Sequence, residues 1–518
     1  MSSTTKLSGK QLLVPGLIAL GAVLRFIGAA GRPLDGDEGV ILKIASGSVS
    51  HVLQTAAQDV HPPLFHLLTS LSLTLFGTSA LALRLVSILA GIGVVAFGPA
   101  IARRLKTNEA LVTALLATAP FLVYVSQDAR MYSLLMLLVV ASWVLLMELW
   151  DRPTEFRTWV TWALVGAMMV LTHHLGWVVL AGELVTTLLF YRDTFTKTRH
   201  WVGAVALIVV AYLPQVSTTL SQVTGRLAEQ STAAGWSARG ASLVGAIYRF
   251  AAGRTFLNLN PHALVDLAGQ SPLKFGLFLL SFAVPTILLI VGIIHLIVTD
   301  RKPFLALTTL VAVPLLAAVL IGSVAIQAPR YLAFLAPFGI AVIAVGVAEV
   351  WNTRGVWGKL LAILSAGVFM AGLWTQLGVH DHAPGIDAFA SEVTSSAQPG
   401  DVVLIRGAFA GGEVTAFTYE QNRFIEDQIE QYGQWLPTRL PIVDMYGDYS
   451  VGNLAQLRAR KPADSIANLL TTYDRVWFFD QTYVANPLVG LDAADRVHVY
   501  NLGMDKEHQS LLLYEITR

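Results

Sequence analysis

The sequence predicts an α-helical polytopic membrane protein that carries a small α/β domain at its C-terminus. Of its 518 residues, 54% are hydrophobic and only 13% are charged, and the mean hydropathy is +0.61, whereas soluble domains carry about 25% charged residues. About eleven apolar stretches are long enough to cross a bilayer, which takes roughly 17–25 residues. From about residue 379 the composition turns polar. These three observations set the fold class.

The first predicted span follows a short polar segment that contains Lys6 and Lys10. It lacks a clear small-residue cleavage site and is followed by many further spans, so we expect a retained helix rather than a removed signal peptide. The predicted spans lie near residues 12–30, 80–102, 109–126, 130–149, 158–175, 176–191, 201–214, 273–298, 304–326, 330–350 and 357–377.

One further apolar stretch, Pro63 to Phe76, is too short for a full span and decides the topology. If it lies at the interface as a juxtamembrane helix, every basic connection faces the cytoplasm, as the positive-inside rule requires. We therefore expect a cytoplasmic N-terminus. The features then placed outside are the acidic first loop, residues 126–130, the connection from about residue 215 to 271, and everything after residue 378.

The chain is expected to form two domains, a transmembrane domain at residues 1–378 and an extracytoplasmic α/β domain at residues 379–518. Three β-like runs begin at Asp401, Arg475 and Ser510, and helix-like stretches separate them. This alternation predicts a largely parallel sheet. A net charge of +1 gives no sign of a nucleic-acid partner. With no cysteine, a disulfide framework or a thiol nucleophile is excluded.

An acidic cluster made of Asp35, Asp37 and Glu38 follows the first span. Charges at the mouth of a membrane helix are costly and are usually kept for chemistry, although a solvated loop paired with Arg32 is the alternative. Arg25, within the first span, and the polar segment from Asp59 to His61 strengthen the case for a polar site.

Several polar motifs follow one another along the apolar part of the chain. They are Leu24-Arg25-Phe26, Asp37-Glu38, Asp59-Val60-His61-Pro62-Pro63-Leu64-Phe65-His66, Arg84-Leu85-Val86-Ser87, Arg103-Arg104-Leu105, Ser126-Gln127-Asp128-Ala129-Arg130-Met131-Tyr132, Thr172-His173-His174-Leu175-Gly176 and Pro329-Arg330-Tyr331-Leu332. Their order resembles the GT-C glycosyltransferases, most closely the branch of protein O-mannosyltransferases and aminoarabinose transferases. The resemblance covers roughly residues 12–350, and the C-terminal domain lies outside it.

The resemblance implies a GT-C fold of about eleven transmembrane helices with juxtamembrane helices. It also implies transfer of a hexose or pentose from a polyprenyl-phosphate donor to an acceptor hydroxyl at the outer face, with inversion. Asp37 looks like the general base, and Glu38 looks like a residue that orients a neighbour or the acceptor. Asp128 matches a second acidic position, which binds sugar hydroxyls, assists the base or pairs with Arg130.

Cations and hydrogen-bond donors suit the donor phosphate, and Arg330 is the best placed of them because it stands at a membrane boundary beside Tyr331. Snorkelling of Arg330 to the interface is the alternative. No obligatory cofactor is expected, while a divalent cation, as some relatives use, stays open. The candidates for the donor phosphate are His61, Arg130, Tyr132, His173, Arg254, Arg330 and Tyr331.

The main rival interpretation is a transporter or flippase of a lipid-linked substrate, which the intramembrane Glu183 would also suit. A lipid-linked-glycan ligase and a membrane-anchored binding protein are two further alternatives. The predicted partners are the bilayer, the lipid-linked donor and an acceptor that is a protein, a lipid or a glycan.

Overall fold

The computed structural model divides the chain into two units, residues 1–31 with 44–380 and residues 32–43 with 381–518. Residues 32–43, which the sequence groups with the membrane domain, therefore cluster with the C-terminal unit. The structure describes residues 9–31, 36–57, 59, 61–220, 248, 250, 271–321, 329–378, 392, 393, 395–406, 442–444, 462–480, 497–504 and 510–517.

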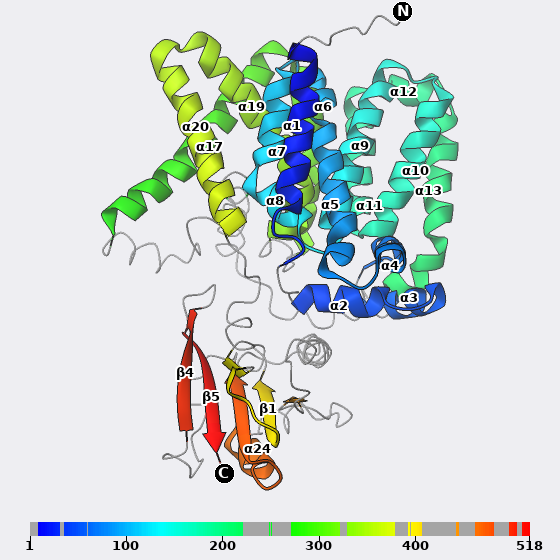
Figure 1. Ribbon diagram of the computed structural model, residues 1–518. Helices are drawn as coiled ribbons and strands as arrows, with labels where there is room; N and C mark the ends of the chain where they lie inside the picture. Colours follow the sequence, from blue (N-terminus) through cyan, green and yellow to red (C-terminus); the bar gives the residue numbers. More distant parts are fainter. Residues whose placement is uncertain are drawn as a thin grey trace, which may run out of the picture. The chain divides into compact units, whose positions relative to one another are not determined.

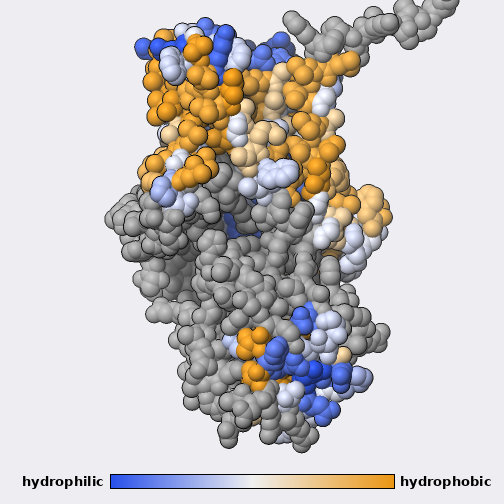
Figure 2. All heavy atoms as spheres, turned by 60° about the vertical axis from the view of Figure 1, so that its left-hand side comes forward, coloured by the Kyte–Doolittle hydropathy of each residue, from blue (hydrophilic) through white to orange (hydrophobic). Residues whose placement is uncertain are grey.

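The first unit is a bundle of apolar helices (Figure 1). Figure 2 shows apolar side chains around the sides of this bundle and polar side chains at one end. Its helices are α1 (Gly9–Phe26), α3 (Val49–Ala56), α4 (Leu64–Phe76), α5 (Ala80–Ala96), α6 (Gly98–Arg104), α7 (Glu109–Thr118), α8 (Pro120–Ser126), α9 (Tyr132–Asp151), α10 (Phe156–Thr172), α11 (Leu175–Phe190), α12 (Asp193–Thr196), α13 (His200–Tyr212), η1 (Leu213–Gln215), α17 (Pro272–Thr299), α18 (Arg301–Ile321), η3 (Pro329–Leu335), α19 (Ala336–Thr353) and α20 (Gly355–Gly378).

Six helices of the described part are long and apolar enough to cross a membrane, and the bent pair α7–α8 makes a seventh. The predicted spans correspond to these seven and to four shorter apolar helices, Leu12–Phe26, Phe156–Thr172, Leu175–Phe190 and Phe304–Leu316. The polytopic helical fold is therefore confirmed. The span predicted at residues 201–214 is longer than expected, because the helical segment continues from His200 to Leu220.

Helix α4 does not need to cross the bilayer. Arg84, near the start of α5, donates from Nη1 to the carbonyl oxygen of Ala29, just after α1, at 2.7 Å. Since the end of α1 and the start of α5 meet, the chain between them leaves and returns to the same end of the bundle. This contact favours the juxtamembrane placement predicted for Pro63 to Phe76.

The basic connections gather at the opposite end of the bundle. Lys106 pairs with Asp300 at 2.6 Å between Nζ and Oδ2, and Arg104 pairs with Asp151 at the same N–O distance. Both pairs join loops that are far apart in the sequence. In Figure 1, α12 lies at this end, whereas α3 and α4 lie at the other. Charge is therefore segregated along the bundle axis, as the sequence predicts.

The third predicted span is broken at Pro120, where α7 and α8 meet at an angle of 58°. Proline has no N–H to donate to the carbonyl of Leu116. The buried side chain of Arg25 fills this gap: Nη2 donates to the carbonyl of Leu116 at 3.2 Å and Nη1 to that of Ala117 at 3.3 Å. Its Nε donates to Ser126 Oγ at 3.1 Å. This intramembrane arginine thus joins α1 to the break.

The acidic cluster is not a loop throughout, contrary to the sequence prediction, because Asp37 and Glu38 lie in the first turn of helix α2 (Gly36–Ala45). Carboxylates are stabilising near a helix N-terminus. The next residues, Val40, Ile41 and Ile44, are buried at helical spacing. The side chain of Asp37, like all of Asp35, lies outside the described residues.

The second unit contains a five-stranded sheet in the order β2-β1-β3-β5-β4. Only β2, β1 and β3 are parallel; β5 runs antiparallel to β3 and β4. The predicted largely parallel sheet is therefore only partly correct, because the connection from β4 to β5 is too short for a parallel crossover. The elements are β1 (Asp401–Arg406), β2 (Ile442–Asp444), α24 (Pro462–Leu469), β3 (Arg475–Asp480), β4 (Val497–Met504) and β5 (Ser510–Thr517).

Candidate functional site

The segment from Gln127 to Arg130 connects α8 to α9 at the end of the bundle opposite the basic loops. Gln127 fixes it in place, since its Nε2 lies 3.1 Å from the carbonyl oxygen of Leu24, 3.2 Å from that of Arg25 and 2.8 Å from that of Ile27. These carbonyls end α1 and would otherwise lack helical partners. The segment that carries Asp128 is therefore attached to the end of α1.

Asp128 and Arg130 are both buried in this segment, with residue exposures of 3% and 7%. On α5, Ser87 Oγ donates to the carbonyl oxygen of Arg130 at 3.0 Å. Contacts with α1 and α5 thus fix the segment that carries the Asp128 carboxylate and the Arg130 guanidinium. Buried charges of this kind are rare in membrane proteins unless they face a polar site.

Asp59 brings two histidines together just before and within α4. Its Oδ2 lies 3.3 Å from Nδ1 of His61 and 3.3 Å from Nε2 of His66. Both imidazoles are almost fully buried, at 4% and 0% exposure. Pro62 and Pro63 separate His61 from the start of α4, so the chain turns before the helix and brings the three side chains onto one centre.

Burial, opposed by the contact with Asp59, lowers the pKa of His61 to about 4, and the charge of Arg130 adds to the decrease. Burial raises the pKa of Asp59, but contacts with His61 and His66 outweigh it, and this pKa ends well below its ordinary value. Near neutral pH the cluster therefore holds an ionised carboxylate and a neutral His61.

These shifts predict that the folded protein loses stability as the pH falls. From about pH 6.5 toward 4 the unfolded chain protonates His61 while the folded chain does not, which costs up to about 3 kcal/mol. Ionised Asp59 also stabilises the folded protein at pH values above the pKa of this residue in the unfolded chain. This stabilisation is lost at still lower pH, as the pH falls through the pKa of Asp59 in the folded protein. We expect the melting temperature in detergent to fall over this window and His61→Gln to flatten the dependence. An unchanged pH dependence in His61→Gln would contradict this reading.

His173 lies at the turn between α10 and α11, and its ring centroid is 5.0 Å from that of His61. Its Nδ1 accepts a hydrogen bond from the backbone N–H of Leu175 at 3.0 Å. A neutral imidazole that accepts at Nδ1 carries its hydrogen on Nε2. His173 therefore acts as a hydrogen-bond donor on its other edge.

Tyr132, at the start of α9, and Tyr331, in η3, complete the cluster around His173. The two tyrosine rings are 5.5 Å apart, and they lie 6.1 and 6.2 Å from the His173 ring. The Arg330 guanidinium carbon is 6.0 Å from the Tyr132 ring and 5.9 Å from the Tyr331 ring. Cation–π contacts at this range orient a guanidinium. Arg330 therefore has ring contacts within the bundle, which interfacial snorkelling alone does not require.

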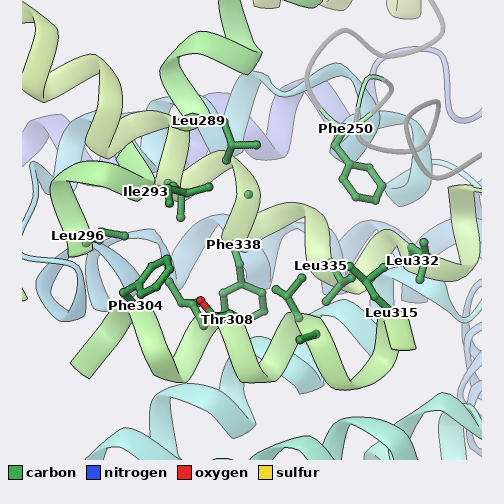
Figure 3. A pocket seen from close by; sticks show the side chains of 15 residues that line it. Phe250, Leu289, Ile293, Leu296, Phe304, Thr308, Leu315, Leu332, Leu335 and Phe338 are labelled. Carbon is green, nitrogen blue, oxygen red and sulfur yellow. The ribbon is translucent and has the colours of Figure 1, made fainter. Parts of the chain in front are cut away.

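An apolar cavity of about 420 Å³ lies between α17, α18 and the η3–α19 segment (Figure 3). Leu332 and Leu335 line it and follow Arg330 and Tyr331 within η3. Among the described lining residues only Thr308 has a polar side chain. The lining residues are Phe250, Leu289, Ile293, Leu296, Phe304, Leu307, Thr308, Val311, Ala312, Leu315, Leu332, Leu335, Phe338, Gly339 and Val342.

The structure brings together some of the predicted site residues and not others. One cluster of contacts unites five of them, His61, Tyr132, His173, Arg330 and Tyr331, and the charge of Arg130 acts on His61. Glu38 is buried at 1% exposure, in the unit that includes residues 32–43. The side chain of Asp37 and the whole of Arg254 lie outside the described residues, so their predicted roles stay predictions.

His174, by contrast, has a structural partner, since its Nδ1 lies 2.9 Å from the Tyr212 hydroxyl on α13. Glu183 is also engaged: its Oε2 accepts hydrogen bonds from Ser142 and Trp162. The Glu183 carboxyl group thus links α11 to α9 and α10, which gives it a structural role within the bundle. Among the described residues, no group of three or more His, Asp and Glu side chains is arranged to hold a metal ion.

Sequence reasoning assigned no individual role to three residues of the site, Asp59, His66 and Gln127. Asp59 and His66 flank His61 in a short motif, so a shared acidic partner for two histidines was a detectable signal. Gln127 gave no such signal, because its role depends on the packing of α8 against the end of α1.

Comparisons with known proteins agree with this architecture. The sequence profile of the family "dolichyl-phosphate-mannose-protein mannosyltransferase" matches residues 60–217, which include His61, Asp128 to Tyr132 and His173. No curated protein matches the chain.

Solved structures of similar fold include ArnT from Cupriavidus metallidurans bound to undecaprenyl phosphate, at 15% identity and a TM-score of 0.53, with 98% of each chain covered. The apo form of that protein gives 14% identity, a TM-score of 0.54 and the same coverage. An Archaeoglobus fulgidus oligosaccharyltransferase gives 13% identity and a TM-score of 0.50, covering 90% of this chain and 68% of that chain. Residues 60–217 are thus similar to this mannosyltransferase family, and the chain shares the GT-C fold of these solved structures.

Proposed function

We propose that the protein transfers a sugar from a polyprenyl-phosphate donor to an acceptor hydroxyl at the extracytoplasmic face, with inversion. The observation that carries this proposal is the composition of η3. Within seven residues it presents the Arg330 guanidinium and then the leucines that line the apolar cavity. A ligand that joins an anionic group to a long apolar chain fits such an arrangement.

The donor phosphate is proposed to bind Arg330, with Arg130 adding positive charge and His173 donating from Nε2. Tyr132 and Tyr331 hold the guanidinium in place, and Arg254 stays a candidate for the same phosphate. Charge-assisted hydrogen bonds stabilise a phosphate that gains charge as the sugar leaves. The first isoprene units would then lie in the cavity shown in Figure 3.

In the proposed reaction the acceptor oxygen attacks the anomeric carbon while the bond from that carbon to the phosphate oxygen breaks. The hydroxyl proton passes to the carboxylate of Asp37, and polyprenyl phosphate leaves with the electron pair. Because a phosphate is a good leaving group, the step needs one base and no separate acid. Glu38 is proposed to orient the acceptor and Asp128 to bind sugar hydroxyls or assist the base. We propose no obligatory metal.

Thermal stabilisation of the purified protein by a panel of undecaprenyl-phosphate sugars tests the donor class. A ligand that binds only the folded state raises the melting temperature by mass action. We expect at least one member of the panel to stabilise the protein in a concentration-dependent way and free sugars not to do so. Equal stabilisation by uncharged polyprenols would contradict a phosphate-directed site.

The orientation is also a proposal, supported by the basic residues gathered at one end of the bundle. It predicts that Thr196, in α12, faces the cytoplasm and that Ala463, in α24, faces outward. Because the native chain has no cysteine, Thr196→Cys and Ala463→Cys can each be labelled with an impermeant thiol reagent in intact cells. Labelling of Ala463→Cys alone is expected, and labelling of Thr196→Cys alone would reverse the topology.

A further inference from the structure

The Asp59–His61 pair gives His61 a defined hydrogen-bonding role. Asp59 Oδ2 lies 3.3 Å from His61 Nδ1, and an ionised carboxylate can only accept hydrogen bonds. His61 must therefore carry a hydrogen on Nδ1. The Nε2 of His66 lies 3.3 Å from the same oxygen, so Asp59 stands between two imidazoles.

The second nitrogen of His61 follows from its charge. The groups that act on this imidazole are Asp59, His66 and Arg130, and the ring of His173 lies beside it. Burial and the nearby positive charge favour the neutral form, and the pKa of His61 is lowered to about 4. A neutral imidazole with its hydrogen on Nδ1 offers a lone pair at Nε2. His61 is thus a hydrogen-bond acceptor at its other edge.

An acceptor cannot bond to the oxygens of a phosphate diester, which also only accept. The donor does contain hydrogen-bond donors, namely the hydroxyl groups of its sugar. We infer that His61 accepts a hydrogen bond from a hydroxyl of the donor's sugar and does not bind the donor's phosphate, an assignment that rests on the proposed function and refines the prediction made for His61 from the sequence.

The position of His61 supports the choice of the sugar. Its ring centroid is 5.0 Å from that of His173, and His173 lies 6.2 Å from Tyr331, next to the proposed phosphate ligand Arg330. The donor phosphate carries two groups, the polyprenyl chain, which we place in the apolar cavity, and the sugar. His61 and His173 would then lie where the sugar joins the phosphate. There His173 donates a hydrogen bond to the phosphate, and His61 accepts one from the sugar.

Binding of donors with and without the sugar separates the two roles. The probes are undecaprenyl phosphate and its mannose, glucose, galactose and 4-amino-arabinose derivatives, and the readout is the Kd of each for the full-length protein in detergent. For His61→Ala we expect an unchanged Kd for undecaprenyl phosphate. The extra affinity that the sugar gives the wild-type protein should fall by about fivefold to tenfold, the size of one hydrogen bond.

Two further variants give the controls. His61→Gln keeps an acceptor oxygen and should recover part of the sugar-dependent affinity, which a purely structural role would not predict. Arg330→Ala should weaken undecaprenyl phosphate and its sugar derivatives alike. The melting temperature without ligand checks that each variant folds. If His61→Ala does not fold, the comparison of His61→Gln with the wild-type protein is the test.

Either of two results would overturn the inference: an equal loss of affinity for undecaprenyl phosphate and for the sugar lipids in both His61 variants, or wild-type protein that binds no sugar derivative more tightly than undecaprenyl phosphate. Neither result by itself refutes the proposed function, which instead fails if the wild-type protein binds undecaprenyl phosphate and its derivatives but transfers no sugar.

Discussion

Asp37→Asn is expected to lower sugar transfer at saturating donor by about 10²–10⁴-fold, the contribution of a positioned general base. Asparagine keeps the shape and polarity of the side chain but cannot take up the acceptor's proton. Expression, melting temperature and donor affinity should stay near the wild-type values, because the change removes a step in the chemistry. The measurement is the rate of product formation under single-turnover conditions.

Glu38→Gln and Asp128→Asn are the matched controls for the base. Glu38→Gln should cost less than Asp37→Asn if Glu38 orients a neighbour or the acceptor. If Asp37→Asn keeps more than about a tenth of the wild-type rate, the loss is smaller than a positioned base implies. The base would then have to be sought elsewhere, with Asp128 as the first candidate because it is a carboxylate buried within the bundle.

Arg330→Ala is expected to weaken binding of a polyprenyl phosphate by about 10- to 150-fold, which corresponds to about 1.5–3 kcal/mol for a hydrogen bond to a charged group. The physical reason is the loss of a guanidinium that Tyr132 and Tyr331 orient. Arg330→Lys should restore only part of the affinity, because an ammonium group lacks the planar fork that matches phosphate oxygens.

Arg104→Ala serves as the control for a general loss of positive charge. Arg104 pairs with Asp151 at the opposite end of the bundle. The substitution Arg104→Ala should therefore leave the Kd for undecaprenyl phosphate unchanged. Wild-type affinity in Arg330→Ala would mean that this arginine only anchors the chain at the membrane boundary. The Kd values of the two variants, measured side by side, decide between these roles.

The spans and the grouping of basic loops could be predicted from the sequence because they follow from two simple constraints. A bilayer sets the length of each apolar segment, and positive charge marks one face. The short stretch Pro63 to Phe76 was assigned on this basis alone, and the contact between Arg84 and Ala29 agrees with it. These features need no knowledge of how the helices pack.

The arrangement of the site could be predicted only in part. His61, His173 and Arg330 are separated by more than a hundred residues from one to the next, and only the order of motifs typical of the superfamily suggested that they belong together. Gln127 binds carbonyls at the end of α1, about a hundred residues away in the sequence, and no local pattern encodes such a contact. Asp59, by contrast, joins two histidines within one short segment.

The errors also have physical causes. Asp37 and Glu38 suggested a loop because acids are common there, yet at a helix N-terminus they are stabilising. In the C-terminal unit, β-strand patterns gave no direction for β5, which pairs antiparallel with β3. The few residues between β4 and β5 allow only an antiparallel return, so β5 is antiparallel to β4, and β4 is a strand that the sequence analysis does not predict.

The central claim is sugar transfer from a polyprenyl phosphate, and release of undecaprenyl phosphate measures it most directly. Purified wild-type protein and Asp37→Asn in lipid nanodiscs would be incubated with undecaprenyl-phosphate sugars and a cell-envelope extract as the acceptor source. We predict that the wild-type protein releases undecaprenyl phosphate from at least one donor and transfers one sugar to the extract for each undecaprenyl phosphate released. Asp37→Asn should release no undecaprenyl phosphate. Binding of the sugar lipids without release by the wild-type protein, or equal release by both proteins, would contradict the claim.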